Sequence, residues 1–286
     1  MKILFPTDFS ATANQAREYV CNVAKVLNAE VVICHIIPNI LIDPAHERFG
    51  NSVVFPSLNQ VENVLNNFDV DYRLKEKLNS EMEYFDSLGV KSEVISSFGS
   101  VYDQVQLVAA ELKCDLVILG TNGASDIEQE FIGSNAFWVS RSSKIPVITL
   151  RKSVNLGGEN GILLVSNFKE GACEKVVEQA VAFKKTFDCP LDFLFVNTPT
   201  QFVESHVIEE RVATIREAFN LPDSQLIVFN STYLETGILN VLSKLNHLGL
   251  VIFGNHGYSR IRMEVEYSVA DQLISRAKIP IMSVKI

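Results

Sequence analysis

Cysteine and histidine are sparse in this sequence, and neither follows a spacing typical of a metal site or a redox pair. The chain has five of each among its 286 residues, with no CxxC, HxxH or HExxH spacing. This excludes the common zinc motifs and the thioredoxin-like motif. Most of the cysteines lie in apolar runs, so we expect them to be buried and reduced, as in a cytoplasmic protein. They are Cys21, Cys34, Cys114, Cys173 and Cys189.

Long apolar runs and an excess of positive charge are also missing. No stretch approaches the roughly 18 consecutive apolar residues of a membrane-spanning helix, and the first apolar run ends at Pro6, too early for a signal peptide. The formal net charge of −9 argues against nucleic acid or an anionic membrane as a partner. Hydrophobic residues make up 47% and charged residues 21%, the composition of a folded protein with a large core.

The sequence lacks the short motifs that deliver catalytic groups in several large enzyme classes. It has no GxxxxGK[ST] phosphate loop, which would bring a lysine to the β- and γ-phosphates of a nucleotide. It has no GxSxG nucleophile turn and no kinase signature. We therefore predict no catalytic residue and no protein metal ligand.

What the chain does contain is an internal repeat. "KILFPTDFS" at residues 2–10 aligns without gaps with "GILLVSNFK" at 161–169, and "CDLVILGTNG" at 114–123 aligns with "LGLVIFGNHG" at 248–257. "KIPVITL" and "KIPIMSV" then close the two copies. Three segments that recur in the same order indicate a duplicated domain of ordinary size. The predicted domains are 1–152 and 160–286, joined near "RKSVNLGGEN".

Short apolar, β-branched runs alternate with helical patterns in each copy. The first copy offers strands at 2–6, 29–37, 91–97, 115–120 and 146–150, and such continuous apolar runs are typical of strands buried on both faces of a parallel sheet. A helix is expected from Ser10, as its N-cap, to Leu27, because apolar residues recur there every three or four positions. This alternation predicts a doubly wound α/β fold in each domain, with a five-stranded parallel sheet flanked by helices.

The two copies differ most between their second and third strands. The first copy carries "PNILIDPAHERFGNSVVFPSLNQ" there, followed by a helical stretch over about 58–88, whereas the second copy is shorter. Long loops in compact domains often serve as lids or partner surfaces. A plain surface insertion explains the same segment, and both interpretations stay open.

Glycines gather where the strand at 115–120 is expected to end. Gly120, Gly123 and Gly133, followed by Ser134, surround an acidic segment. Ligands bind parallel α/β sheets beyond the carboxyl ends of the strands, where Pro6-Thr7-Asp8 also ends its strand. The glycines let backbone approach a phosphate, and the next helix begins with free N–H groups. The alternative is that they serve only tight turns and close packing.

The pattern Gly120-x-x-Gly123-(nine residues)-Gly133-Ser134, after a strand that ends Pro6-Thr7-Asp8, resembles the nucleotide-binding pattern of the universal stress protein family. "VVICHII" also resembles that family's second strand. The resemblance covers nearly the whole chain, as a tandem member. It implies two tandem Rossmann-like, HUP-type domains, and it implies ATP binding, because members with the intact glycine pattern typically bind ATP.

The resemblance also implies which residues contact the nucleotide at its adenosine end. Pro6, Thr7 and Asp8 would line the adenosine pocket, with Asp8 accepting a hydrogen bond from a ribose hydroxyl or a base amino group. Ile36 would meet the edge of the adenine through its backbone. The neighbouring His35 is assigned no chemistry, because a histidine in an apolar strand usually serves the core.

The phosphate end is implied in the same way. Gly120 and Gly123 would lie along the ribose and phosphates, and Gly133, Ser134 and Asn135 would hold the last phosphates.

The predicted phosphate loop has no base to neutralise a triphosphate. It contains Asp126, Glu128 and Glu130 but neither lysine nor arginine, and a helix N-terminus supplies only about half a positive charge. We therefore expect Mg²⁺ to accompany bound ATP. Ala136 stands where ATP-binding members often carry a hydroxyl residue, which would weaken the grip on the terminal phosphate.

The second copy departs from the pattern. Tyr267 occupies the position of Gly133, and Asn167 that of Asp8, although Gly254 and Gly257 remain. The second copy is expected to bind ATP poorly or not at all, and its basic loop residues leave a different ligand open. A glycine needed only for the fold should have been needed in both copies.

Three functions follow from these observations. The favoured one is an ATP-binding stress-response module whose occupied state is read by a protein partner. The alternatives are a slow ATPase and a nucleotide-free interaction protein whose glycines are structural.

The last strands of the copies, "PVITLR" and "PIMSVK", are apolar enough to lie at sheet edges. Their pairing would give an intramolecular pseudo-dimer, and association of two chains into a homodimer stays open.

Overall fold

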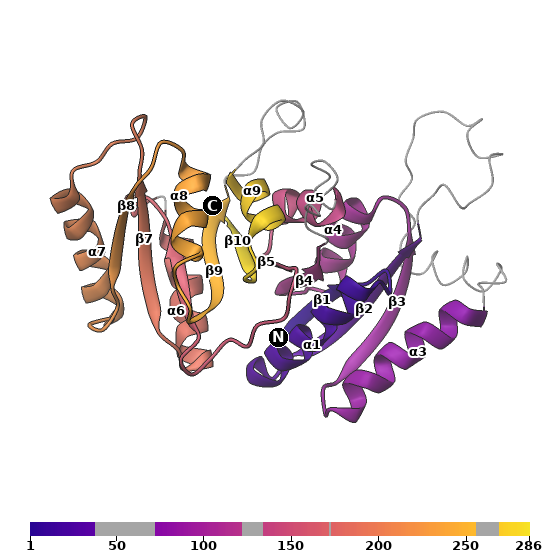
Figure 1. Cartoon of the computed structure of the whole chain (residues 1–286). Coiled ribbons are helices and arrows are strands. Elements are labelled where there is room, and N and C mark those ends of the chain that lie inside the picture. Colours follow the sequence, from indigo (N-terminus) through magenta and orange to yellow (C-terminus); the bar gives the residue numbers. More distant parts are fainter. Residues whose placement is uncertain (38–71, 122–133, 172, 256–268) are drawn as a thin grey trace, which may run out of the picture.

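The computed structural model describes residues 1–37, 72–121, 134–171, 173–255 and 269–286. Within them the first repeat contains nine elements in the predicted alternation (Figure 1). They are β1 (Lys2–Pro6), α1 (Ala11–Leu27), β2 (Glu30–Ile37), α3 (Tyr72–Ser87), β3 (Ser92–Phe98), α4 (Val101–Glu111), β4 (Leu116–Gly120), α5 (Ser134–Ser142) and β5 (Val147–Leu150).

The second repeat follows with the same alternation of strands and helices. Its elements are β6 (Gly161–Val165), α6 (Glu174–Phe187), β7 (Leu191–Asn197), α7 (Ser205–Phe219), β8 (Leu226–Asn230), α8 (Leu234–Leu242), β9 (Leu248–Asn255), α9 (Val269–Arg276) and β10 (Ile281–Lys285).

The predicted strands of the first repeat are confirmed to within one residue at each end. The predicted helix from Ser10 to Leu27 is also confirmed: the Ser10 hydroxyl accepts a hydrogen bond from the Ala13 backbone N–H at 3.2 Å, which satisfies a free donor of the first turn. The insertion at 38–60 lies outside the described residues. Of the helix expected over 58–88, the described part begins at 72.

All ten strands form one sheet in the order β3-β2-β1-β4-β5-β10-β9-β6-β7-β8. Each repeat supplies five strands in a doubly wound order, and the pairs within each repeat are parallel. The predicted fold class is therefore confirmed, with one addition. The sheets of the two repeats are continuous, because β5 pairs antiparallel with β10, placing Met282 opposite Ile148.

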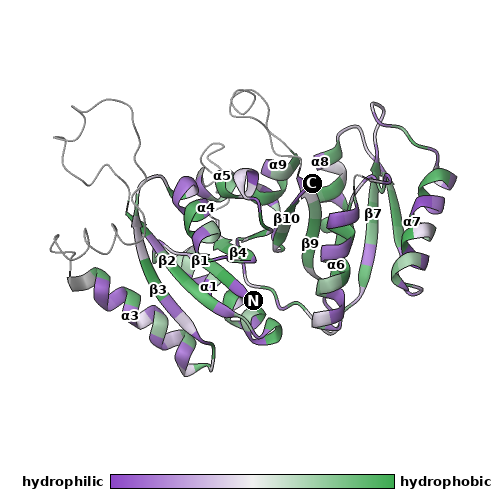
Figure 2. Cartoon of the chain, turned by 180° about the vertical axis from the view of Figure 1, so that it is seen from behind, coloured by the Kyte–Doolittle hydropathy of each residue, from purple (hydrophilic) through white to green (hydrophobic). Residues whose placement is uncertain are grey.

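Helices cover both faces of this sheet. Alternate residues of a strand point to opposite faces, so Ile3 and Phe5 of β1 pack in one apolar cluster and Leu4 in another. The first cluster is continuous across both repeats and includes residues of α1, α3, α6 and α7. On the opposite face α4 and α5 cover the first repeat, and α8 and α9 cover the second. Figure 2 shows this layering as largely green strands between helices that carry purple residues.

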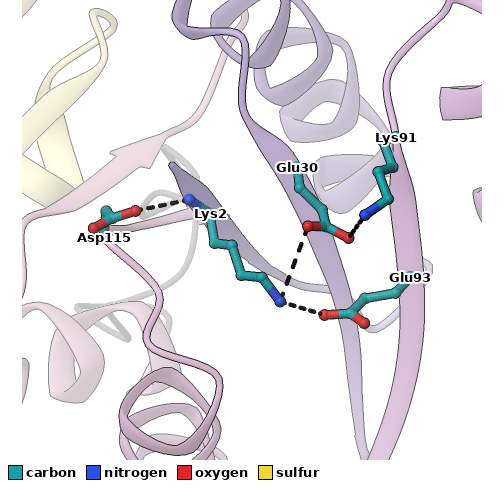
Figure 3. Close-up of polar contacts among 5 residues, drawn as sticks. All are labelled: Lys2, Glu30, Lys91, Glu93 and Asp115. Atoms are coloured by element: carbon teal, nitrogen blue, oxygen red, sulfur yellow. Dashed lines mark hydrogen bonds and ion pairs between the residues drawn. The ribbon is translucent and has the colours of Figure 1, made fainter.

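Charged residues gather at the amino ends of the first strands, opposite the edge where a ligand is expected (Figure 3). The Lys2 ammonium lies 3.1 Å from Glu93 and 4.0 Å from Glu30. Lys91 lies 2.8 Å from the other Glu30 oxygen, and the backbone N–H of Lys2 donates to Asp115 at 2.7 Å. These contacts connect β1, β2, β3 and the start of β4, so they stabilise strand order rather than form a ligand site.

The contact between the repeats is partly polar and is called here the seam. It includes β5, β10 and the facing parts of α5, α9 and β9. Ser140 Oγ lies 2.8 Å from Ser283 Oγ, and the Asn255 amide donates to the Ser140 carbonyl at 3.1 Å. Because Ser140 belongs to the first repeat and its two partners to the second, specific hydrogen bonds as well as strand pairing fix the register of the seam.

Candidate functional site

The turn after β1 is held by its own side chains. The Thr7 hydroxyl accepts a hydrogen bond from the Phe9 backbone N–H at 3.1 Å, and the Asp8 carboxylate accepts from the Ser10 N–H at 2.9 Å. Phe9 has a φ of 61°, in the left-handed region that non-glycine residues seldom adopt. These bonds offset that strain and direct the chain from the end of β1 into α1.

A cavity of about 230 Å³ lies beside this turn, at the carboxyl ends of β1, β2 and β4. Five segments meet there: the β1 turn with the start of α1, the end of β2, the start of α4, the end of β4, and the start of α5. The residues that line the cavity are Pro6, Thr7, Asp8, Ser10, Thr12, Ala13, Cys34, Ile36, Val101, Leu119, Gly120, Thr121, Asn135 and Ala136.

Most of the predicted site residues that the structure describes line this cavity. The structure brings together Pro6, Thr7, Asp8, Ile36, Gly120 and Asn135. Gly123 and Gly133 lie outside the described residues. Ser134 is the first residue of α5, and its side chain also lies outside the described part. The residues predicted for the adenosine end thus lie together, and their contact with a nucleotide stays a prediction, as does the phosphate end.

Gly120 has a packing reason that the sequence did not reveal. A Cβ placed there would lie 2.7 Å from the backbone oxygen of Thr12 in α1, which is closer than any carbon–oxygen contact normally allows. The equivalent Gly254 approaches Ile286 at 2.9 Å and Val176 at 3.1 Å. The close approach of β4 to the α1 backbone therefore requires glycine at 120, whereas Gly254 meets only the ends of side chains. Gly120 alone thus does not distinguish a structural role from ligand binding.

Sequence reasoning missed several lining residues, for two reasons. Some come from the first turn of α1 (Thr12, Ala13) and from the residue after Gly120 (Thr121); their position next to predicted residues could have indicated them. Others, such as Val101 at the start of α4, come from segments that carry no motif. Hydrophobic periodicity placed these segments in helices or strands, but it could not show which end of each reaches the cavity.

The described lining of the cavity is polar but carries little charge. Thr7, Ser10, Thr12, Thr121 and Asn135 contribute hydroxyl and amide groups, and the charged side chain among these described residues is that of Asp8. This group set fits a ligand with many hydrogen-bonding groups. A strongly anionic ligand would need a cation to accompany it.

Cys34 and His35 lie next to the cavity but offer no reactive group there. Burial raises the pKa of the Cys34 thiol to about 12, so the thiol stays protonated near neutral pH and is a poor nucleophile. The Nδ1 atom of His35 lies 2.8 Å from the Thr7 carbonyl oxygen, and the imidazole packs against the Phe9 ring with a centroid distance of 4.7 Å. His35 therefore supports the β1 turn.

The second repeat builds the same turn with different residues. The Ser166 hydroxyl accepts from the Phe168 N–H at 3.2 Å, and Asn167 accepts from the Lys169 N–H at 3.0 Å. Phe168 has a φ of 52°, close to that of Phe9. Because an asparagine oxygen serves this turn as well as a carboxylate oxygen does, the turn does not require the charge of Asp8.

A cavity of about 350 Å³ lies at the equivalent edge of the second repeat. Its lining is mostly apolar, in contrast with that of the first. The residues that line it are Val165, Ser166, Asn167, Val176, Phe195, Val196, Gln201, Leu234, Ile238, Phe253, Gly254, Asn255, Val269, Ala270, Leu273 and Ile286.

The described residues contain neither a cluster of three or more side chains that could hold a metal ion nor a helix long and apolar enough to cross a membrane. All five cysteines are buried and free of disulfide bonds, as expected from their apolar surroundings.

The fold and the cavities define a tandem α/β protein whose two Rossmann-like halves share one sheet, with candidate ligand sites at the carboxyl ends of the strands. The model of the universal stress protein family matches residues 1–151, more than half of the chain. The chain therefore belongs to the universal stress protein family.

Individual relatives agree with this assignment. Universal stress protein MJ0577 of Methanocaldococcus jannaschii is 27% identical over 154 residues, which cover 53% of this chain and 94% of that protein. Universal stress protein G of Escherichia coli O157:H7 is 34% identical over 84 residues, which cover 29% of this chain and 57% of that protein.

A crystal structure extends the similarity of fold to both repeats. A universal stress protein from Archaeoglobus fulgidus DSM 4304 superposes with a TM-score of 0.72, covering 99% of this chain and 96% of its own, at 19% sequence identity. At that identity the similarity concerns the fold alone. It shows that the tandem arrangement of the whole chain has a counterpart.

Proposed function

We propose that the first repeat binds an adenine nucleotide, ATP accompanied by Mg²⁺, in the cavity at the carboxyl ends of β1, β2 and β4. The observation that carries the proposal is the meeting of five separate segments at one polar cavity, located where ligands bind doubly wound sheets. These segments include the Pro-Thr-Asp strand end and Gly120 of the glycine pattern.

The lining suits the adenosine part of the nucleotide. Ile36, Val101 and Leu119 supply apolar surface for a planar base. Asp8 is exposed, and one of its two carboxylate oxygens accepts from Ser10. The other oxygen can accept from a ribose hydroxyl or from the amino group of adenine.

The start of α5 suits the phosphates. Asn135 is exposed at the cavity in the first turn of this helix, where backbone N–H groups and the helix dipole favour an anion. Gly123, Gly133 and Ser134 complete the proposed site. Because Asp8 is the charged group among the described lining residues, Mg²⁺ would supply most of the charge that neutralises the triphosphate.

The second repeat is proposed to bind ATP poorly. Val269 takes the place of Asn135 at the start of the equivalent helix, and Asn167 takes the place of Asp8. Tyr267 takes the place of Gly133 in the sequence. These changes remove the amide of Asn135 and the charge of Asp8, and they add an aromatic ring at the position of Gly133.

The whole chain would then act as a cytoplasmic stress-response module. The proposed domains, 1–152 and 160–286, form an intramolecular pseudo-dimer through β5 and β10, in which nucleotide occupancy of the first domain alters a surface read by a protein partner. Slow hydrolysis of ATP would be incidental, since no described lining residue of the first cavity is a lysine or arginine that could stabilise phosphoryl transfer.

Native mass spectrometry with and without ATP and Mg²⁺ tests the proposal, with ADP, AMP and cAMP as competitors. We expect one nucleotide per chain, lost in Gly133→Tyr, which gives the first repeat the residue of the second. Asp8→Ala should weaken binding, whereas the matched Asn167→Ala should not. Two nucleotides per chain would contradict the asymmetry between repeats. No binding at millimolar ATP would contradict the proposal and favour a nucleotide-free interaction protein.

A further inference from the structure

The cavity of the second repeat is as well formed as that of the first but differs in chemistry. We propose that it binds an uncharged, mostly apolar small molecule that carries a hydrogen-bonding group at one end. This proposal is independent of ATP binding by the first repeat, because it concerns different residues on the far side of the seam.

Equivalent positions in the two cavities show the change in chemistry. Thr12 is the α1 residue that approaches Gly120, and its counterpart next to Gly254 is the buried Val176. Thr12 and Gly120 line the first cavity, and Val176 and Gly254 line the second. A residue with a hydroxyl group in the wall of the first cavity thus has a wholly apolar residue as its counterpart in the second.

The start of the following helix changes in the same direction. Asn135 lines the first cavity and Val269 lines the second. The helices α8 and α4 occupy equivalent places in the two repeats. Leu234 is the first residue of α8, and the smaller Val101 is the first residue of α4. The second cavity has thus lost polar groups and gained apolar surface on two of its walls.

The depth and the rim of the second cavity differ in polarity. Phe195, Ile238 and Leu273 line it and are almost fully buried. Asn167 and Gln201 line it as well, but both are exposed, so they lie at its rim. A ligand with an apolar body and one polar end would place the body inside and the polar end at these two amides.

The polar groups at this cavity already have partners within the protein. The Asn167 side chain accepts from the Lys169 N–H, and its backbone carbonyl accepts from Arg211 at 3.1 Å. The Asn255 amide donates across the seam to Ser140. The described lining residues include no lysine or arginine that could balance the charge of a triphosphate.

The physical reason for a ligand is the apolar surface of the cavity wall, to which Phe195, Ile238 and Leu273 contribute. An apolar guest makes dispersion contacts with this wall. It gains further free energy because its own apolar surface and that of the wall leave water.

The test uses N-phenyl-1-naphthylamine, a neutral apolar fluorophore with a single N–H, titrated against the purified full chain. We expect saturable binding of one molecule per chain, with no displacement by ATP and Mg²⁺. The double variant Val176→Thr/Val269→Asn gives the second cavity the two residues of the first. It should weaken binding at least about tenfold, as expected when apolar contacts are lost from a pocket.

Two further variants keep the test decisive. Val269→Asn alone changes a half-buried residue at the start of a helix, so it should weaken binding even if the double variant fails to fold. Val26→Ser removes an exposed apolar side chain of α1 and should leave binding unchanged. Absence of saturable binding, displacement by ATP, or equal affinity in a folded Val269→Asn variant would each overturn the proposal.

Discussion

The guanidinium of Arg141 in α5 lies 3.8 Å from the carboxylate of Asp271 in α9, inside the seam between the two repeats. Both side chains are almost fully buried, with exposed fractions of 2% and 0%. The Arg141 guanidinium also lies over the Phe137 ring, 4.8 Å from its centroid. This ion pair joins the two helices whose first turns line the two cavities.

Removing the Asp271 charge should destabilise the protein strongly. Asp271→Asn leaves the buried Arg141 guanidinium without this carboxylate, and breaking a buried pair in this way costs about 3–5 kcal/mol. Urea unfolding measures the change in free energy. Glu111→Gln, at an exposed position in α4, is the control and should stay within about 0.5 kcal/mol of the parent. Equal midpoints for the two variants would show that the ion pair adds nothing to the seam.

The turn-forming residues Asp8 and Asn167 should contribute similarly to stability but differently to binding. Each accepts a hydrogen bond from the N–H two residues later, at 2.9 and 3.0 Å, so replacement by alanine should cost each repeat about 1 kcal/mol. If ATP binds as proposed, Asp8→Ala alone should raise the Kd measured by calorimetry. A loss of affinity in Asn167→Ala of the same size would place the nucleotide in the second repeat or in both.

Gly120→Ala should be more damaging than Gly254→Ala. A Cβ at 120 meets the rigid backbone oxygen of Thr12, whereas a Cβ at 254 meets the ends of two side chains that can turn aside. We expect a loss of about 1–3 kcal/mol in the first case, typical of forced overpacking, and a smaller loss in the second. Thermal unfolding compares the two variants. The opposite order would contradict the packing explanation for Gly120.

Acid should weaken the charged contacts at the amino ends of the strands. The hydrogen bond from Lys91 holds the pKa of Glu30 below its ordinary value of 4.5. A depressed pKa in the folded state means that this stabilisation is present above the unfolded value and is lost as pH falls through the folded value. Lys91→Gln should therefore flatten the fall in stability as the pH drops below about 4.5.

The Lys2 ion pair in the same group of contacts should depend on pH in the opposite direction. The hydrogen bond to Glu93 raises the pKa of Lys2 above 10.5, so its contribution is present below that value and is lost as pH rises through the folded pKa. Glu93→Gln should reduce this loss. Both effects should be small, since the groups are partly exposed, and salt at about 1 M should suppress them. Persistence of the acid effect in high salt would point to another carboxylate.

Hydrophobic patterning was enough to place the strands and the α1 helix. The run from Lys2 to Pro6 and the spacing from Ser10 to Leu27 each have a local cause, burial on both faces or along one stripe, and the structure confirms both. The helical stretch expected over about 58–88 agrees with α3 in its described part, from Tyr72 to Ser87.

The candidate site was predictable where residues followed a strand end. Pro6, Thr7 and Gly120 terminate parallel strands, and parallel strands place their carboxyl ends at one edge. Val101 could not be predicted in this way, because its place at the cavity depends on how far α4 is shifted along the sheet. That shift depends on side-chain packing between distant segments.

By itself the sequence determined the duplication, the alternation of strands and helices, and the edge at which ligands are expected, since all three follow from periodicities along the chain. The tertiary structure decided the rest. It fixed the antiparallel register of β5 and β10, buried Arg141 against Asp271, and gave the two cavities different walls. These features depend on contacts between residues more than a hundred positions apart, and no local pattern in the chain specifies such contacts.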